Sequence, residues 1–151
     1  MKKPWIILVA CFLSVAAAAE HHSSAEAELR EAVIAFNVAY ANNTVDDYID
    51  FYADGATVFW YGARQDIAAY HVEWSAMIAA GGGVEKNDMS DLRVQILASG
   101  DVAVTTYFVD NRTRSADGEV ESIRAFETDV WQKIDGAWKV VSLHYSLLLP
   151  E

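Results

Sequence analysis

The closing stretch of the sequence carries the side chains best suited to acid–base chemistry. Glu127, Asp129 and Trp131 occupy every second position of a run rich in β-branched and aromatic residues, and His144 lies in the next such run. Alternate residues of a strand share a face, so both carboxyls would lie together. Two buried carboxyls repel, which raises one pKa as a general acid or base requires. We therefore predict Asp129 and His144 as the catalytic pair.

Each of these groups also has a structural interpretation. The carboxyls could face solvent and pair with arginines. His144 shares its parity with Trp138, Val140 and Ser142, and a histidine among apolar strand residues is often a hydrogen-bonded core group. Parity alone does not say which face of the strand carrying Asp129 would line a pocket.

Further ligand-binding candidates come from aromatic residues and a second histidine. Trp60 and Trp131 are predicted to line a pocket together with Glu127, and Tyr40 and His71 complete the set. Aromatic stripes at helical spacing are more commonly core, which is the alternative for these positions. A pocket with flat walls would suit a small apolar or aromatic ligand.

Metal and cofactor sites are not predicted. The sequence has no His-x-x-x-His and no paired cysteine, and the acidic loop at 85–88 lacks calcium-loop spacing. The glycines at 81–83 lack the Lys-Ser/Thr of a phosphate loop, so we interpret them as a flexible linker or lid hinge.

The first nineteen residues have the pattern of a signal peptide. Lys2 and Lys3 precede an apolar stretch at 5–15 and small residues at 16–19. This predicts cleavage after Ala19 and a periplasmic or secreted protein without a membrane span. The alternative is a lipoprotein cleaved before Cys11, the one cysteine, although five apolar residues before it make a short apolar region.

Length and charge indicate one acidic domain over residues 20–151. The chain has 22 acidic and 11 basic residues, for a formal charge of −11. Such a surface repels nucleic acid and anionic lipid, so neither is an expected partner.

The pattern predicts helices first and an antiparallel meander last. The Asp135-Gly136 pair is a hairpin signal, and Ser23-Ser24 with Glu26 predicts a helix start. We expect an α+β fold with three N-terminal helices packed on one face of a curved antiparallel sheet. The expected helices are 23–43, 44–53 and 66–80; the expected strands are 56–60, 91–98, 102–113, 119–134 and 137–147.

With this order in hand, the chain resembles the nuclear transport factor 2-like superfamily, in its SnoaL-like branch. It is also similar to the association domain of calcium/calmodulin-dependent protein kinase II. The resemblance implies a cone-shaped, cystatin-like fold with a pocket between the first helix and the sheet, and a dimer through the outer sheet face. It is carried by residues 52–58 (YADGATV), 127–131 (ETDVW), 135–141 (DGAWKVV) and 144–146 (HYS).

The resemblance also argues against one reaction mechanism and one class of ligand. The base, tyrosine and acid positions of ketosteroid isomerase fall on Trp60, Phe36 and near Phe126, which cannot perform those roles, so that mechanism is not expected. An arginine of the kinase association domain falls on Asp129, which implies a neutral, cationic or aromatic ligand instead of a simple carboxylate.

Two functions of different classes remain open. The first is an exported small-molecule binder or cofactor-free enzyme with lyase- or isomerase-type acid–base chemistry in the cone. The second is a non-catalytic oligomerisation or protein-binding module. A homodimer is expected in either case, with Val104, Phe108, Phe126 and Val130 as the outer face. An inhibitor protein would also be compatible with the acidity.

Overall fold

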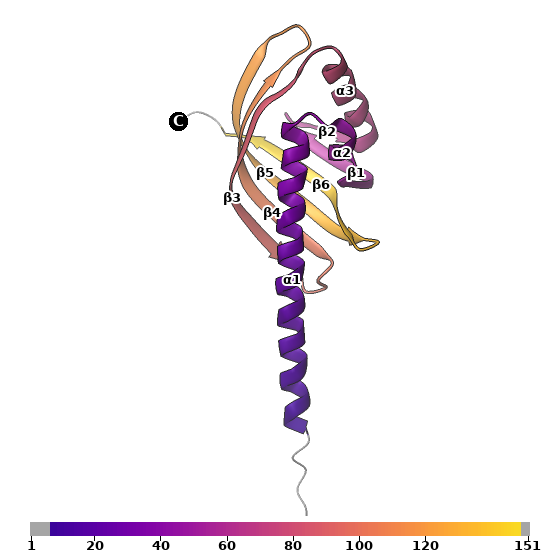
Figure 1. Cartoon of the computed structure of the whole chain (residues 1–151), viewed down its shortest axis with the longest axis vertical. Coiled ribbons are helices and arrows are strands. Elements are labelled where there is room, and N and C mark those ends of the chain that lie inside the picture. The colour runs from indigo at the N-terminus through magenta and orange to yellow at the C-terminus, as the bar shows by residue number, and fades with distance from the viewer. Residues whose placement is uncertain (1–6, 149–151) are drawn as a thin grey trace, which may run out of the picture.

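The computed structural model describes the backbone of residues 7–148 and the side chains of residues 23–148. A long helix, α1 (Ile7–Ala41), lies across the concave side of a curved sheet and extends past its edge (Figure 1). The sheet has six strands in the order β2-β1-β6-β5-β4-β3, in which β1 and β6 run parallel and the other neighbours antiparallel. The predicted α+β class is confirmed, with a mixed sheet in place of a purely antiparallel one.

The remaining elements follow in chain order. Helices α2 and α3 lie near one end of α1, where the strands curve away from it (Figure 1). The elements are α2 (Val45–Ile49), β1 (Tyr52–Trp60), β2 (Ala63–Asp66), α3 (Ile67–Ala79), β3 (Gly83–Ile96), β4 (Val102–Arg114), β5 (Val120–Ile134) and β6 (Ala137–Leu147).

Helix α1 begins earlier than predicted. Its backbone is continuous through Ser23, and the Ser24 hydroxyl donates to Glu28 Oε1 (3.1 Å) within the helix instead of capping its start. Of the predicted signal peptide, residues 1–6 lie outside the described residues and residues 7–19 belong to α1. Among the described residues, no helix combines the length and apolarity needed to cross a bilayer.

The apolar stripe of α1 forms one half of the core, as its spacing predicts. Leu29, Val33 and Phe36 are buried against the sheet. The Phe36 ring packs edge-on against Trp131, with centroids 5.6 Å apart. Burial of a side chain of this size contributes about 1.5–3 kcal/mol. This stripe therefore holds α1 over the sheet and sets one wall of the space between them.

The closing hairpin contains both a confirmed turn and an unforeseen bulge. Asp135 and Gly136 both have positive φ (51° and 85°), as a two-residue hairpin turn of this hand requires. The β5–β6 pairing then shifts, since Trp131 faces Val140 while Val130 faces Ser142. One extra residue, Val141, reverses the parity of everything that follows it on β6.

Two of the three glycines after α3, Gly82 and Gly83, are closely packed, so they do not form the predicted linker or lid hinge, whereas a Cβ on Gly81 would meet nothing within 4 Å. A Cβ on Gly83 would lie 2.6 Å from Asn43 Oδ1, and one on Gly82 would lie 2.7 Å from the Arg114 carbonyl oxygen. The Asn43 side chain bonds both the amide and the carbonyl of Val84 (2.7 and 2.9 Å). β3 consequently starts at Gly83, ahead of the predicted strand.

Candidate functional site

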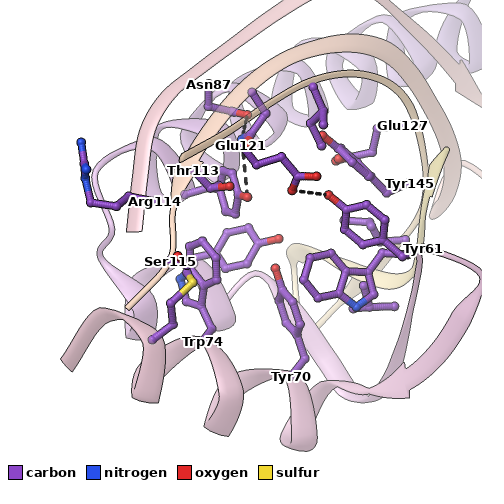
Figure 2. Close-up of a pocket in the computed structure, with 18 of the residues that line it drawn as sticks. Tyr61, Tyr70, Trp74, Asn87, Thr113, Arg114, Ser115, Glu121, Glu127 and Tyr145 are labelled. Atoms are coloured by element: carbon purple, nitrogen blue, oxygen red, sulfur yellow. Dashed lines mark hydrogen bonds between the residues drawn. The ribbon is translucent and has the colours of Figure 1, made fainter. Parts of the chain in front are cut away.

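A cavity of about 470 Å³ lies between the helices and the concave face of the sheet. α1, α2 and α3 supply one side, and β1, β3, β4, β5 and β6 supply the other (Figures 1 and 2). Most of its wall is aromatic or aliphatic. The polar groups within it are Asn37, Asn87, Asn111 and Glu127, with Thr113, Arg114, Ser115, Glu119 and Glu121 also lining it.

Flat aromatic rings form the helical side of the cavity. Tyr40 stacks on Trp74 with ring centroids 5.1 Å apart and an interplanar angle of 17°. Tyr70 lies nearly parallel to Trp74, and its edge meets Trp60 at 82°. The sequence places Tyr70 and Trp74 one turn apart on α3, and the Asp66 side chain caps this helix by accepting from the Ala69 amide (2.8 Å). Planar apolar ligands match such walls.

Two carboxyls on β5 share one tyrosine hydroxyl. Glu127 and Asp129 point to the same side of the strand, and Tyr107 of β4 lies between them. Its hydroxyl contacts Asp129 Oδ2 at 2.8 Å and Glu127 Oε1 at closer range. Thr105 donates to Asp129 Oδ2 (3.2 Å) and accepts from the Trp131 indole N–H (2.9 Å). Glu127 lines the cavity, whereas Asp129 is fully buried behind it.

The geometry of this cluster and the raised pKa values of its carboxyls both indicate that the pair carries a proton. A hydroxyl has one proton, so Tyr107 can donate to only one carboxyl. Its contact with the second carboxyl is a hydrogen bond only when that carboxyl carries a proton. Burial raises the pKa of Glu127, and the nearby Asp129 raises it further. Burial also raises the pKa of Asp129 to about 7, against hydrogen bonds that lower it. Near neutral pH the pair therefore retains a proton.

No cation offsets the pair within residues 23–148. The ion pairs of these residues lie elsewhere and involve neither Glu127 nor Asp129. Each carboxyl interacts electrostatically with the other carboxyl and with tyrosines. These tyrosines are Tyr107 of β4, Tyr145 of β6, Tyr40 of α1, Tyr48 of α2, Tyr70 of α3 and Tyr52 of β1. A neutral, protonated carboxyl is the stable state in such surroundings.

A row of three asparagines runs from α1 across β3 to β4. Asn111 Nδ2 donates to Asn87 Oδ1 (3.1 Å), and Asn87 Nδ2 donates to Asn37 Oδ1 (3.0 Å). Asn37 Nδ2 in turn donates to the Val33 carbonyl (3.0 Å) and, at 3.4 Å, to the Tyr107 hydroxyl. The row thus connects Asn87 and Asn111 to the Tyr107 hydroxyl and, through it, to the carboxyl pair.

A hydrogen bond at the mouth of the cavity joins two exposed residues that are distant in sequence. Tyr61, in the turn after β1, donates to Glu121 Oε2 of β5 (3.0 Å; Figure 2). Partial burial and the neighbouring Glu121 raise the pKa of Tyr61 to about 12, so its hydroxyl remains a donor. Arg114 also lies at the mouth, where it pairs with Glu85.

The structure brings together only part of the predicted site. Glu127, Tyr40 and Trp60 line the cavity. Asp129 lies inside the protein and acts on the cavity only through its neighbours. Trp131 is wholly in the core, where it binds Thr105, so its assignment as a wall residue is wrong.

Neither predicted histidine reaches the cavity. His144 is exposed on the outer face of β6, where its ring lies beside Phe59 and its Nε2 is 3.2 Å from Ser146 Oγ. The bulge at Val141 places it there, so the predicted Asp129–His144 pair does not form. His71 lies on the outer side of α3, with its Nε2 3.2 Å from Asp46 Oδ1 of α2.

Sequence reasoning missed Tyr107 and the three asparagines. A usable signal existed at Asn111, which shares its parity on β4 with Tyr107 and Val109, all of them inward-facing. An amide on an inward strand position requires a buried partner. The partners, Asn37 and Asn87, come from α1 and β3, and their contact depends on tertiary packing.

Of the three residues that fall on the catalytic positions of ketosteroid isomerase, Phe36 and Trp60 line the cavity, while Phe126 faces the outer side of the sheet.

Among the described residues, no group of three histidine, cysteine or carboxylate side chains is arranged to hold a metal ion.

Solved structures share this architecture at low sequence identity. A structure from Exiguobacterium sibiricum, described as a calcium/calmodulin-dependent kinase II association domain, superposes with a TM-score of 0.71 at 9% identity, over 83% of this chain and 95% of that one. The hub homology domain of that kinase from Chlamydomonas reinhardtii gives 0.65 at 24% identity, over 82% and 97%. A ketosteroid isomerase-like protein from Erwinia carotovora atroseptica gives 0.67 at 19%, over 82% and 96%.

These likenesses show the fold. No curated protein sequence matches the chain. The SnoaL-like domain family matches residues 29–150, which is most of the sequence. The match covers more than half of the chain, and the chain belongs to the SnoaL-like domain family.

Proposed function

We propose that the protein binds a small neutral ligand with a flat apolar body in the cone cavity and acts on it by cofactor-free acid–base chemistry. One observation carries the proposal: two buried carboxyls meet at one hydroxyl with no cation paired to them among residues 23–148, and Glu127 is the one of the two that lines the aromatic cavity. A carboxyl held neutral near pH 7 donates a hydrogen bond or a proton to a ligand oxygen.

The chemistry follows from the arrangement of the pair. Glu127, in its protonated form, would donate to a carbonyl or hydroxyl oxygen of the ligand. Asp129 remains behind it on the Tyr107 hydroxyl, with its own pKa raised to about 7 by burial. Transfer of the Glu127 proton to a ligand carbonyl oxygen, with return to Glu127 of a proton from the neighbouring carbon, would convert a ketone into its enol, which is an isomerase-type reaction without a cofactor. Loss of a β-hydroxyl from that enol as water, with re-formation of the carbonyl, would be the lyase-type variant. A ligand carboxylate is disfavoured, because the pair would repel it.

A ligand screen tests this function. Thermal shift with steroid ketones, flat aromatic ketones, aromatic acids and amines should select neutral ketones, and NMR of each mixture over hours would detect turnover. Glu127→Gln retains a hydrogen-bond donor but has no transferable acidic proton. It should keep binding and lose turnover, whereas a pure binder would show no turnover in either protein. Preference for aromatic acids would contradict the proposal.

Assembly is the second candidate function, and the outer face of the sheet favours it. Phe108 and Phe126 pair across β4 and β5 with centroids 5.2 Å apart, and Arg124 lies over the Phe108 ring (5.4 Å). The association and hub domains among the similar structures suggest an oligomer here too. Light scattering should give a homodimer, and Phe126→Glu should dissociate it. A monomer at all concentrations would exclude this function.

We further propose export to the periplasm or outside the cell, supported by the leader pattern of residues 1–19. N-terminal sequencing of protein from the native host should begin at Glu20. Retention of Met1 would contradict it, and a lipidated Cys11 would support the lipoprotein alternative.

A further inference from the structure

We infer that the asparagine row is a ligand subsite, one that recognises a cis-amide edge such as that of a flat lactam. The inference rests on the proposed function, because it names the ligand class of the same cavity. It concerns Asn87 and Asn111, which line the cavity (Figure 2 labels Asn87) and lie apart from the carboxyl pair in the hydrogen-bond chain.

The direction of the row is forced by its anchor. The Val33 carbonyl accepts only, so the Asn37 amide must turn its NH₂ toward it. Asn37 Oδ1 then has to accept from Asn87, and Asn87 Oδ1 has to accept from Asn111. The orientation of all three amides therefore follows from one backbone oxygen.

Counting donors and acceptors along the row leaves two groups open. Asn37 uses both of its N–H groups, on Val33 and Tyr107. Asn111 also uses both, on Asn87 and on the Tyr40 hydroxyl at 3.5 Å. Asn87 uses one N–H, so its second is free. Both hydrogen bonds of the Asn111 side chain come from Nδ2, so Asn111 Oδ1 has no hydrogen-bond partner among the described residues. Neighbouring amides thus offer one donor and one acceptor to the cavity.

A cis-amide is the group that satisfies both. Its N–H would donate to Asn111 Oδ1 and its carbonyl would accept from Asn87 Nδ2. The Tyr40 hydroxyl that receives Asn111 belongs to the ring stacked on Trp74. A planar ring lying along that stack therefore brings its edge toward Asn111, which favours an aromatic lactam over an open-chain amide.

Three probes of nearly equal shape test the subsite by calorimetry. 2-Quinolinone carries both groups, N-methyl-2-quinolinone lacks the donor, and naphthalene lacks both. The wild-type protein should bind 2-quinolinone about tenfold more tightly than its N-methyl form, the effect of one hydrogen bond, and naphthalene more weakly still. This comparison needs no variant, so it stands whether or not a variant folds.

Variants of the protein test the same hydrogen bond by changing the residue that accepts it. Asn111→Leu should remove most of the difference between 2-quinolinone and its N-methyl form. Thr113→Val, a change in the same cavity outside the row, should preserve it. Equal binding of all three probes to the wild type would overturn the subsite and leave the aromatic cavity as proposed. Binding of none would overturn both.

Discussion

Glu127 and Asp129 contact the same tyrosine hydroxyl from adjacent inward positions of β5, yet only Glu127 reaches the cavity. Burial raises the pKa of both carboxyls, so the one that lines the cavity and the one behind it hold a proton as a pair. This relationship makes the protonation of the cavity depend on residues that no ligand would touch.

Stability should decrease as the pH rises through the titration of this pair. Between the ordinary Asp pKa of 3.8 and the raised value of about 7, the native state retains a proton that the unfolded chain has released. The free energy of unfolding then falls with pH, by at most about 1.4 kcal/mol per pH unit for one proton. Urea denaturation at pH 5, 6, 7 and 8 measures the slope.

The slope belongs to the pair and should disappear with it. Glu127→Gln with Asp129→Asn should give a flat profile over this range, while Asp54→Asn at an exposed position of β1 should retain the wild-type slope. A wild-type profile that rises from pH 5 to pH 8 would contradict the assignment.

Tyr107→Phe should destabilise the protein by about 1–3 kcal/mol, because it removes the donor between two buried carboxyls. The loss should be larger at pH 8, where more carboxylate needs a donor, than at pH 5. Chemical denaturation at both pH values measures it. An equal loss at both would mean that the hydroxyl serves packing alone.

His144→Ala should leave both stability and ligand binding unchanged within about 0.5 kcal/mol, since the side chain is exposed on the outer face. Thermal denaturation and calorimetry with 2-quinolinone provide the two measurements. Weaker probe binding in this variant would place His144 in the site after all.

Tyr61→Phe should speed the exchange of ligand severalfold with little change in stability, because it opens the bridge to Glu121 at the cavity mouth. Stopped-flow tryptophan fluorescence with 2-quinolinone measures the association and dissociation rates. Rates identical to those of the wild type would show that ligands do not pass this bridge.

Gly83→Ala should cost about 2–4 kcal/mol, since its Cβ would collide with the Asn43 side chain, 2.6 Å away, at a φ of 146°. Gly55→Ala is the matched control. Its φ is also positive (73°), but a Cβ there meets nothing within 4 Å, so about 1 kcal/mol of strain is expected. Thermal denaturation compares the two, and equal losses would contradict the close packing at Gly83.

Local sequence patterns predict much of the fold. The α1 stripe of Leu29, Val33 and Phe36, the Asp66 cap and the Asp135-Gly136 turn all depend on residues close in sequence, and all three are observed. Strand β2 and the early start of β3 were missed because they are stabilised by pairing with β1 and β4.

The sequence by itself determined the order of the helices and of the strands other than β2, the placement of Glu127 and Asp129 on one face of their strand, and the aromatic character of the cavity, because strand and helix periods act over a few residues. Tertiary structure alone decided that Val141 bulges and turns His144 outward, that Tyr107 joins the two carboxyls, and that asparagines from three elements form one row. Those features depend on register and on contacts between distant segments, which no local period encodes.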